Sequence, residues 1–479
     1  MPTPALALAA DFPAATRADW LAAVEKTLKG AAIETLNGAT PDGLGVQPLY
    51  TAEDAPAPAS FAPAPRAAER AWDVRAAVAH PDLARANKQI LEDLAGGAAS
   101  VLVTVDPAGM DGVAVGSAEG LARLLDGVML DLAPIALDAG FHGAACAKWL
   151  GAAAKASPAA PLAFHLDPLS ALAAAGSSPG PIEAHLAAGA SLAARLADTY
   201  PKASLYRADG RAVHEAGGSP DGELAFAAAA ALAYAKALVG VGFSIDAAFG
   251  RIVLGLSVDG DVFASIAKLR AARLVWGKLA GACGATAPAR IEARSSHRML
   301  TVAEPWTNLV RLTVAGFAAA AGGADTIVLD AFTDALGLPT SFARRLARKT
   351  QLILMEEAHV GAVGDPLAGA WAVEALTDQL ARAAWGKFIA IEAAGGIVEA
   401  LRSGLIAREV DDARAALRDA AASGTVKIVG VTDFVATPTA PPDVEPRPNV
   451  SIATPDPRLP GPDTHCPALA PIRLEALAT

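Results

Sequence analysis

Several histidines fall at or just after short apolar segments, where a side chain could do chemistry. The clearest is His214, which stands beside Glu215 in the run GRAVHEAGGS. Histidine can exchange a proton near neutral pH, because its ordinary pKa lies close to 6.5. The same position also suits a buried ring that only completes hydrogen bonds. His142, His165 and His297 occupy comparable positions, and position alone makes none of them a catalyst.

Eight apolar segments alternate with helical stretches between Ala71 and about Ala407. They cover residues 71–78, 100–106, 134–139, 162–167, 204–209, 251–258, 290–296 and 325–331. Eight strand–helix repeats predict a mixed α/β fold, a closed (β/α)8 TIM barrel whose strand ends would carry any active site. A doubly wound open sheet is the alternative with the same alternation.

The chain divides into three regions by composition. Residues 1–65 are expected to form an N-terminal arm, with a helix over 15–29 and then a Pro/Ala-rich linker, that wraps another subunit. Residues 66–423 hold the predicted barrel. Residues 424–479 are rich in proline, which excludes a long helix or a central strand, so an extended tail is expected.

Composition excludes several classes of function. The formal net charge is −11 and the basic residues form no blocks, which argues against nucleic-acid or membrane-surface binding. Three widely spaced cysteines predict neither zinc nor disulfides and fit a cytoplasmic protein. No HxxxH or HExxH pair occurs, so no metal site is expected. The apolar stretch 226–243 is alanine-rich and contains Lys236, so we expect a buried helix, not a membrane span.

Two long stretches resemble the methylmalonyl-CoA mutase family. They are FASIAKLRAARLVWGKLAG (263–281) and residues 304–377, which contain the ordered series ALGLPT…ARKTQ…EE…DPLAG…VEALT. The phrases LAADFPAATRADWLAAVEKTL and AWDVRAAVAHPD are similar to those of the small, or beta, subunits of heterodimeric mutases. The resemblance covers about residues 7–420.

This resemblance implies a particular chemistry. In the family, the pantetheine of a CoA ester threads the barrel, and a separate flavodoxin-like domain binds adenosylcobalamin. The cofactor starts a radical rearrangement between methylmalonyl-CoA and succinyl-CoA. Catalytic chains carry a tyrosine after the first strand, a histidine after the fifth strand, and a DxHxxG motif that ligates cobalt.

The matching positions here depart from that pattern. Ala77 stands at the tyrosine position and Ala212 at the histidine position. His214 lies two residues further on, which in an extended segment is ~7 Å away. In the phrase IEARSSH, Glu292 replaces a histidine and Arg294 a glutamine. The Glu292 carboxylate would repel an anionic substrate unless Arg294 neutralises it. His214, Glu292 and Arg294 are therefore predicted to be vestiges of a site.

These departures predict a non-catalytic small subunit of methylmalonyl-CoA mutase. No DxHxxG occurs, so we expect no cobalamin-binding domain, no catalytic residue and no cofactor on this chain. Adenosylcobalamin would be bound by a large (alpha) subunit, the expected partner. One alternative is the substrate-binding subunit of a split acyl-CoA mutase of the 2-hydroxyisobutyryl-CoA type. Another is a module that binds acyl-CoA without chemistry.

Overall fold

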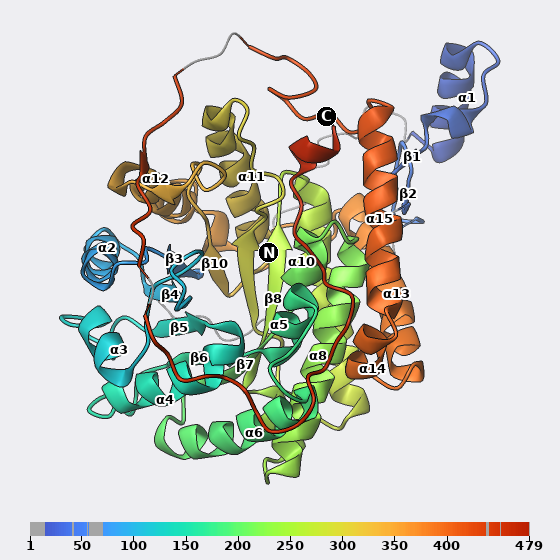
Figure 1. Cartoon of the computed structure of the whole chain (residues 1–479). Coiled ribbons are helices and arrows are strands. Elements are labelled where there is room, and N and C mark those ends of the chain that lie inside the picture. The colour runs from blue at the N-terminus through green and yellow to red at the C-terminus, as the bar shows by residue number, and fades with distance from the viewer. Residues whose placement is uncertain are drawn as a thin grey trace, which may run out of the picture.

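Eight parallel strands close into a barrel in the order β10-β3-β4-β5-β6-β7-β8-β9 (Figure 1). The computed structural model describes residues 15–40, 43–54, 56, 70–436, 440–450 and 452–478. The strands are β3 (Asp73–Val78), β4 (Ser100–Thr104), β5 (Ile135–Asp138), β6 (Ala163–Leu166), β7 (Ser204–Asp209), β8 (Ile252–Val258), β9 (Ile291–Ser295) and β10 (Thr326–Val328). Each predicted segment contains one of them. The predicted barrel is confirmed and the open sheet is wrong.

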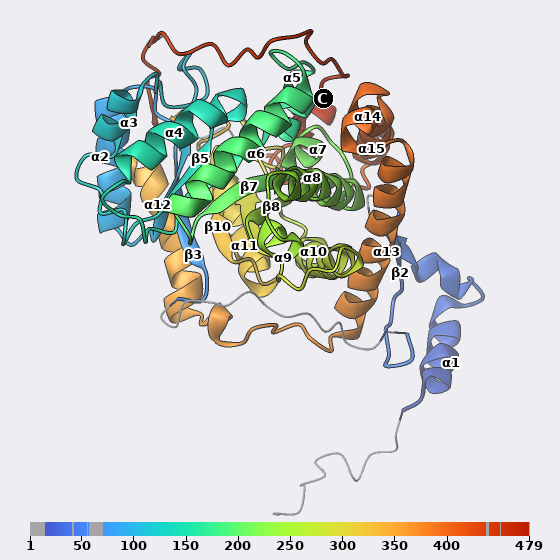
Figure 2. The ribbon, with the colours of Figure 1, turned by 90° about the horizontal axis from the view of Figure 1, so that it is seen from below.

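Helices surround the barrel on its outside (Figure 2). They are α2 (Leu83–Ala95), α3 (Ala118–Leu124), α4 (Gly143–Ala153), α5 (Pro168–Ala175), α6 (Ile182–Thr199), α7 (Arg211–Glu215), α8 (Pro220–Gly240), α9 (Ile245–Phe249), α10 (Val262–Ala282), α11 (Asn308–Ala321), α12 (Ser341–Leu352), α13 (Trp371–Ala393), α14 (Ile397–Arg402) and α15 (Leu405–Ala422). Alanine favours helix and lets helices approach closely, which suits this crowded outer layer.

The helix α8 lies in the densest part of the outer layer. It packs against β7, β8, α10 and α13, and the run Ala227–Ala231 is fully buried. Among the described residues it is the one helix that is long and apolar enough to cross a membrane by length and composition. However, 67% of its most apolar window is buried inside the protein. The helix α8 is therefore buried as a core helix is.

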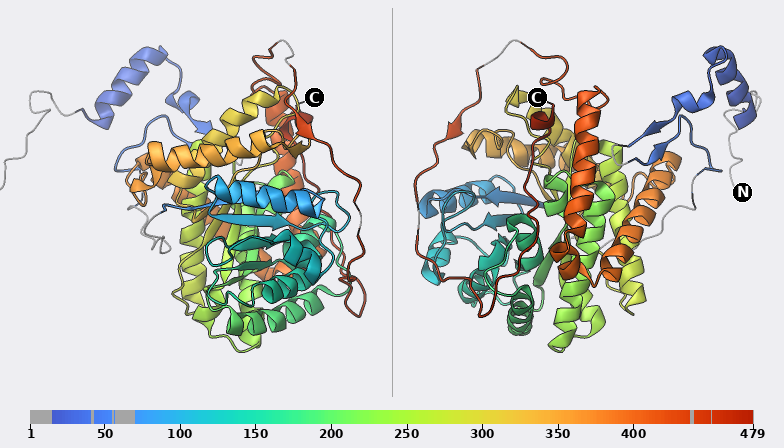
Figure 3. Two further views of the ribbon diagram at one scale, coloured as in Figure 1. Left: turned by 90° about the vertical axis from the view of Figure 1, so that its left-hand side faces the viewer. Right: turned by 45° about the vertical axis from the view of Figure 1, so that its right-hand side comes forward.

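The N-terminal arm stands away from the barrel (Figure 3). Its helix α1 (Arg17–Leu28) begins at a capping box, in which Thr16 and Asp19 bond each other's backbone N–H groups. None of its residues is buried. A short hairpin of β1 (Gly38–Ala39) and β2 (Gly45–Val46) follows. Most of the predicted Pro/Ala linker, residues 57–69, lies outside the described residues. That the arm wraps another subunit stays a prediction.

The proline-rich tail runs around the end of the barrel where the strands terminate (Figures 1 and 3). Its strand β12 (Val444–Glu445) pairs with β11 (Leu338–Pro339), which follows β10. Further along, its backbone bonds the loop after β4 through Ile452, and residues after β6 through Thr464 and Cys466. Backbone bonds to Glu215 and Arg298 then attach it beyond β7 and β9. We call residues 440–450 and 452–478 the belt.

We predict that the belt is a docked part of the fold and not a loose extension. Leu469 is buried and its N–H bonds the carbonyl of Ala173. Leu469→Ala should lower the free energy of unfolding by about 2–3 kcal/mol, because it removes a buried side chain and leaves a cavity. Urea titration measures this. The control Val435→Ala, at a side chain that is 67% exposed, should change little. Equal effects of the two variants would contradict a docked belt.

Candidate functional site

Charged side chains fill the interior of the barrel. Alternate residues of a strand face opposite sides, so Glu292 and Arg294 of β9 point inward while Ile291 and Ala293 belong to the outer core. The other inward charges come from β3, β5, β7 and the segment after β10. They are Arg75, Asp138, Arg207, Asp209 and Asp330. TIM barrels ordinarily fill this space with branched apolar side chains.

Glu292 joins the charges from opposite walls of the barrel. It is 1% exposed, and its two oxygens contact Nη1 of Arg75 and, at 3.3 Å, Nη1 of Arg207. Burial alone would raise its pKa. The neighbouring His165 and the two guanidinium groups outweigh burial and hold the pKa of Glu292 well below its ordinary value. The carboxylate is therefore ionised and shared between two arginines.

The network continues toward the strand ends. Arg207 also contacts Asp138 at 2.9 Å and Asp209 at 3.1 Å, and Asp209 bonds Arg211 at 2.5 Å. Asp138 lies 3.8 Å from Arg294. We call this set of ion pairs, from Arg75 through Glu292 and Arg207 to Asp138, the bore network. It crosses the passage through which a thread-like ligand would have to run.

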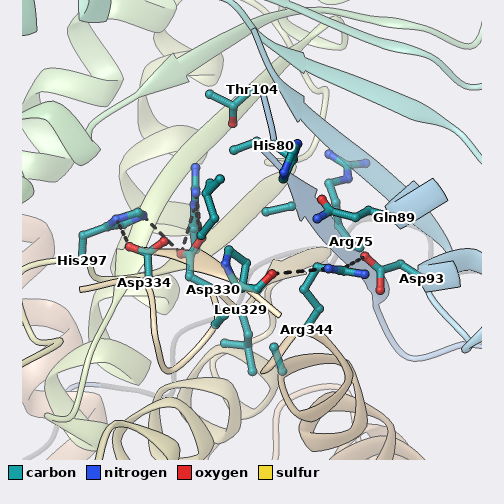
Figure 4. Close-up of a pocket in the computed structure, with 18 of the residues that line it drawn as sticks. Arg75, His80, Gln89, Asp93, Thr104, His297, Leu329, Asp330, Asp334 and Arg344 are labelled. Carbon is teal, nitrogen blue, oxygen red and sulfur yellow. Dashed lines mark hydrogen bonds and ion pairs between the residues drawn. The ribbon is translucent and has the colours of Figure 1, made fainter. Parts of the chain in front are cut away.

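A cavity of about 570 Å³ opens at the strand ends, above part of this network (Figure 4). Arg294, Asp330, His297 and Asp334 form a polar cluster on its wall. Figure 4 shows His297 facing the two aspartates, at 3.3 Å from Asp330 and 3.0 Å from Asp334. Arg294 bonds Asp330 at 2.7 Å. Each charge in the cluster faces an opposite charge.

The two aspartates control the protonation of His297. Partial burial would lower the pKa of its imidazole, but Asp330 and Asp334 raise it to about 10. His297 is therefore a cation at neutral pH and cannot accept a proton there. It completes an ion pair and is not a general base.

The cavity does not continue down the barrel. Ala77, Thr104 and Arg75 of the bore network line it, whereas the deeper network residues Glu292 and Arg207, and His165, do not. Belt residues Pro471, Ile472 and Arg473 line it as well. The bore network thus bounds the cavity on the barrel side, and the belt contributes to its wall near the strand ends.

The structure places the predicted site residues in different surroundings. Ala77 lines the cavity, so a methyl group stands at the position where the resemblance implies a tyrosine side chain. Ala212 and His214 lie on the helix α7, so the extended segment expected there is wrong. Two residues on a helix point ~200° apart, and His214 lines a second cavity instead.

His214 is held in a buried polar cluster. Its Nε2 lies 2.7 Å from Oγ of Ser296, and its Nδ1 lies 3.6 Å from a carboxylate oxygen of Glu223. Burial and the nearby Arg298 and Lys268 keep its pKa well below the ordinary value, so the ring is neutral. The adjacent Glu215 accepts backbone N–H bonds from His297 and Arg298. His214 is thus separated from the cavity at the strand ends.

Glu292 and Arg294 do not neutralise each other, contrary to one of the expectations from the sequence. Glu292 pairs with Arg75 and Arg207, and Arg294 pairs with Asp330. The reason is their positions on β9, where they face inward at successive levels of the barrel. Sequence reasoning missed Arg75 and Arg207. The available signal was a charge at alternate positions of an apolar strand, as in DVRAAV and SLYRAD.

Of the remaining strand-end histidines, His80 follows β3 and lines the cavity, where its Nδ1 accepts the backbone N–H of Asp82 and burial lowers its pKa. His165 is buried with φ +45°, and burial lowers its pKa to about 3. His142 lies at the start of α4 and is half-buried. Within the described part of the chain, no group of three His, Cys, Asp or Glu side chains could hold a metal ion.

We predict that Glu292 is a structural necessity. Glu292→Gln should destabilise the protein by about 3–5 kcal/mol, because it leaves two buried guanidinium groups without their shared carboxylate. The matched control is Glu183→Gln, whose side chain is 55% exposed in a surface pair with Arg402. This control should cost at most about 1 kcal/mol in urea unfolding. A small effect of Glu292→Gln would contradict the bore network.

We predict a loss of stability at alkaline pH that depends on His297. Because its folded-state pKa of about 10 lies above the unfolded value, its stabilisation is complete below about pH 6.5 and is lost as the pH rises toward 10. His297→Gln should flatten the unfolding free energy between pH 7 and 10. Asp334→Asn should move the loss to lower pH. Identical profiles for wild type and His297→Gln would refute this assignment.

Comparison with known proteins agrees with this architecture. The family model described as methylmalonyl-CoA mutase matches residues 40–454. A methylmalonyl-CoA mutase small subunit of Streptomyces virginiae is 40% identical, over 94% of this chain and 75% of its own length. That of Propionibacterium freudenreichii subsp. shermanii is 34% identical, over 90% and 70%. A methylmalonyl-CoA mutase of Rhizobium meliloti is 30% identical, over 87% and 63%. The chain belongs to the methylmalonyl-CoA mutase family.

Proposed function

We propose that this chain is the non-catalytic small subunit of a heterodimeric methylmalonyl-CoA mutase. The observation that carries the proposal is the bore network, in which Glu292 joins Arg75 and Arg207 across the barrel. A pantetheine arm that threads the barrel would have to break these buried ion pairs. Breaking one partner away from such a pair costs several kcal/mol, which supports a barrel that is closed to substrate.

The surroundings of the strand ends support the same proposal. Ala77 offers no hydrogen-bond donor to the cavity, and His214 lies in another one. Two histidines line the cavity. His297 is held as a cation between two aspartates, and His80 is 7% exposed, with its Nδ1 accepting the backbone N–H of Asp82. No residue of this set combines a free acid–base group with access to a thioester. These features support the proposal that the chain is inactive by itself.

The residues present also do not fit adenosylcobalamin, on which the family depends. A corrin is a wide, flat macrocycle and needs an open face at the strand ends. Ile472 and Leu474 of the belt bond the backbone of Glu215 and Arg298 there, and Arg473 lines the cavity. In this proposal the large subunit binds the cofactor.

The partner in this proposal is a large subunit. Two relatives carry the name small subunit, which implies a second, larger chain. The exposed helix α1, with no buried residue, is available for that contact. Binding to the folded state stabilises both chains by mass action, so a barrel without chemistry still has a role. The proposal places the complex in the cytoplasm.

We predict that mutase activity requires the partner. The purified chain with adenosylcobalamin and methylmalonyl-CoA should show no turnover, whereas co-expression with its large subunit should yield an active complex. Ala77→Tyr should not create activity in the isolated chain, because the bore network stays in place. Turnover by the isolated chain would overturn the proposal.

Calorimetry with CoA esters separates the alternatives. A closed barrel predicts no saturable binding of methylmalonyl-CoA to the isolated chain. Binding without turnover would favour the acyl-CoA-binding module. Turnover with a separate cobalamin protein would favour the split acyl-CoA mutase.

A further inference from the structure

A second cavity of about 610 Å³ lies outside the barrel, and the proposed function does not use it. It is bounded by the start of α10, the outer side of α11, the helix α15 and the segment 426–429. This size falls within the ordinary range of small-molecule sites, about 300–1,000 Å³. The site is therefore large enough for a ligand of its own.

One part of this cavity is apolar. Its wall there comes from helices and from the chain that follows α15, which are brought together by the fold. The apolar lining residues include Met299, Val310, Val314, Leu417, Ile428 and Leu474. Val310 is 66% exposed, so this apolar wall also meets solvent. A hydrocarbon chain placed here would remove that surface from water.

Another part of the cavity carries buried cations. Lys268 is 3% exposed and is paired with Glu223 at 2.6 Å. Arg298 is 7% exposed, and its carboxylate neighbour Asp259 lies 3.7 Å away, beyond hydrogen-bond distance. Its Nε has no hydrogen-bond partner among the described residues. That Nε is closed off from the cavity as well, so the donor that a ligand oxygen can reach is Nη2, whose carboxylate neighbour Asp259 is only at long range.

A second guanidinium on the lining has carboxylates near it, Glu304 and Glu475, but no direct ion pair with a described residue. Arg311 donates to neutral oxygens of Thr307, Asn308 and Val429, and makes no ion pair within the described part of the chain. The lining residues include four cations and two carboxylates in all: Lys268, Arg298, Arg311, Lys427, Asp259 and Asp261. Guanidinium groups bind carboxylates through charge-assisted, often bidentate hydrogen bonds.

We propose that this cavity is a binding site for an apolar carboxylate, a hydrocarbon chain with one carboxylate head. The head bonds Arg298, and the chain lies against Val314 and Leu417. The site lies apart from the bore network, so it stands independently of the proposed lack of catalysis.

Octanoate tests the proposal, with calorimetry on the full chain. We expect saturable binding with Kd of about 0.1–1 mM, which a ligand of this size can reach. Acetate, which lacks the chain, and 1-octanol, which lacks the charge, should each bind at least ~10-fold more weakly. Octanol binding as tightly as octanoate would refute a carboxylate site, and no octanoate binding would refute the site altogether.

Two tryptophan variants of α11 locate the ligand. Val314→Trp fills the cavity and should abolish octanoate binding, whereas Thr313→Trp adds the same ring on the exposed side of the helix and should not. Arg298→Gln should weaken octanoate at least ~10-fold and leave octanol unchanged. Thermal melts confirm that each variant is folded. Unchanged octanoate binding by a folded Val314→Trp protein would overturn the assignment.

Discussion

The shared carboxylate of Glu292 is the constraint on which the interior of this protein depends. Arg75 and Arg207 come from strands on different sides of the barrel and each has further carboxylate partners, but Glu292 is the carboxylate that contacts both of them. In the proposed function, the same three side chains lie across the path that a substrate arm would take. In this proposal, the ion pairs that stabilise the interior of the barrel also close it to a thread-like ligand.

The barrel itself was predictable because its strands are buried on both faces. Parallel strands covered by helices read as continuous apolar runs, and all eight were found from that signal. The charged interior was not predictable from the same signal. Arg75 and Glu292 are far apart in the sequence, and only the inward alternation of β3 and β9, and the barrel that brings these strands together, allow them to meet.

The environment of His214 shows where motif alignment fails. If GRAVHEAGGS were extended, the side chain of His214 would lie on the same side of the chain as that of Ala212, two residues further along. The helical turn of α7 instead separates the two side chains, and His214 bonds Ser296. A short helix after a strand is set by tertiary packing, because five residues are too few for propensity to decide. The alignment identified the correct residues, but the conformation that it assumed for the backbone between Ala212 and His214 was wrong.

The position of the belt at the C-terminal side of the barrel also affects the order in which the protein folds during synthesis. Its residues leave the ribosome after every loop that they contact, since the loops beyond β4, β6, β7 and β9 all precede residue 440. A nascent chain thus completes its strands and outer helices while the strand-end loops are still bare. Docking of the belt onto these loops therefore has to follow synthesis of the whole barrel.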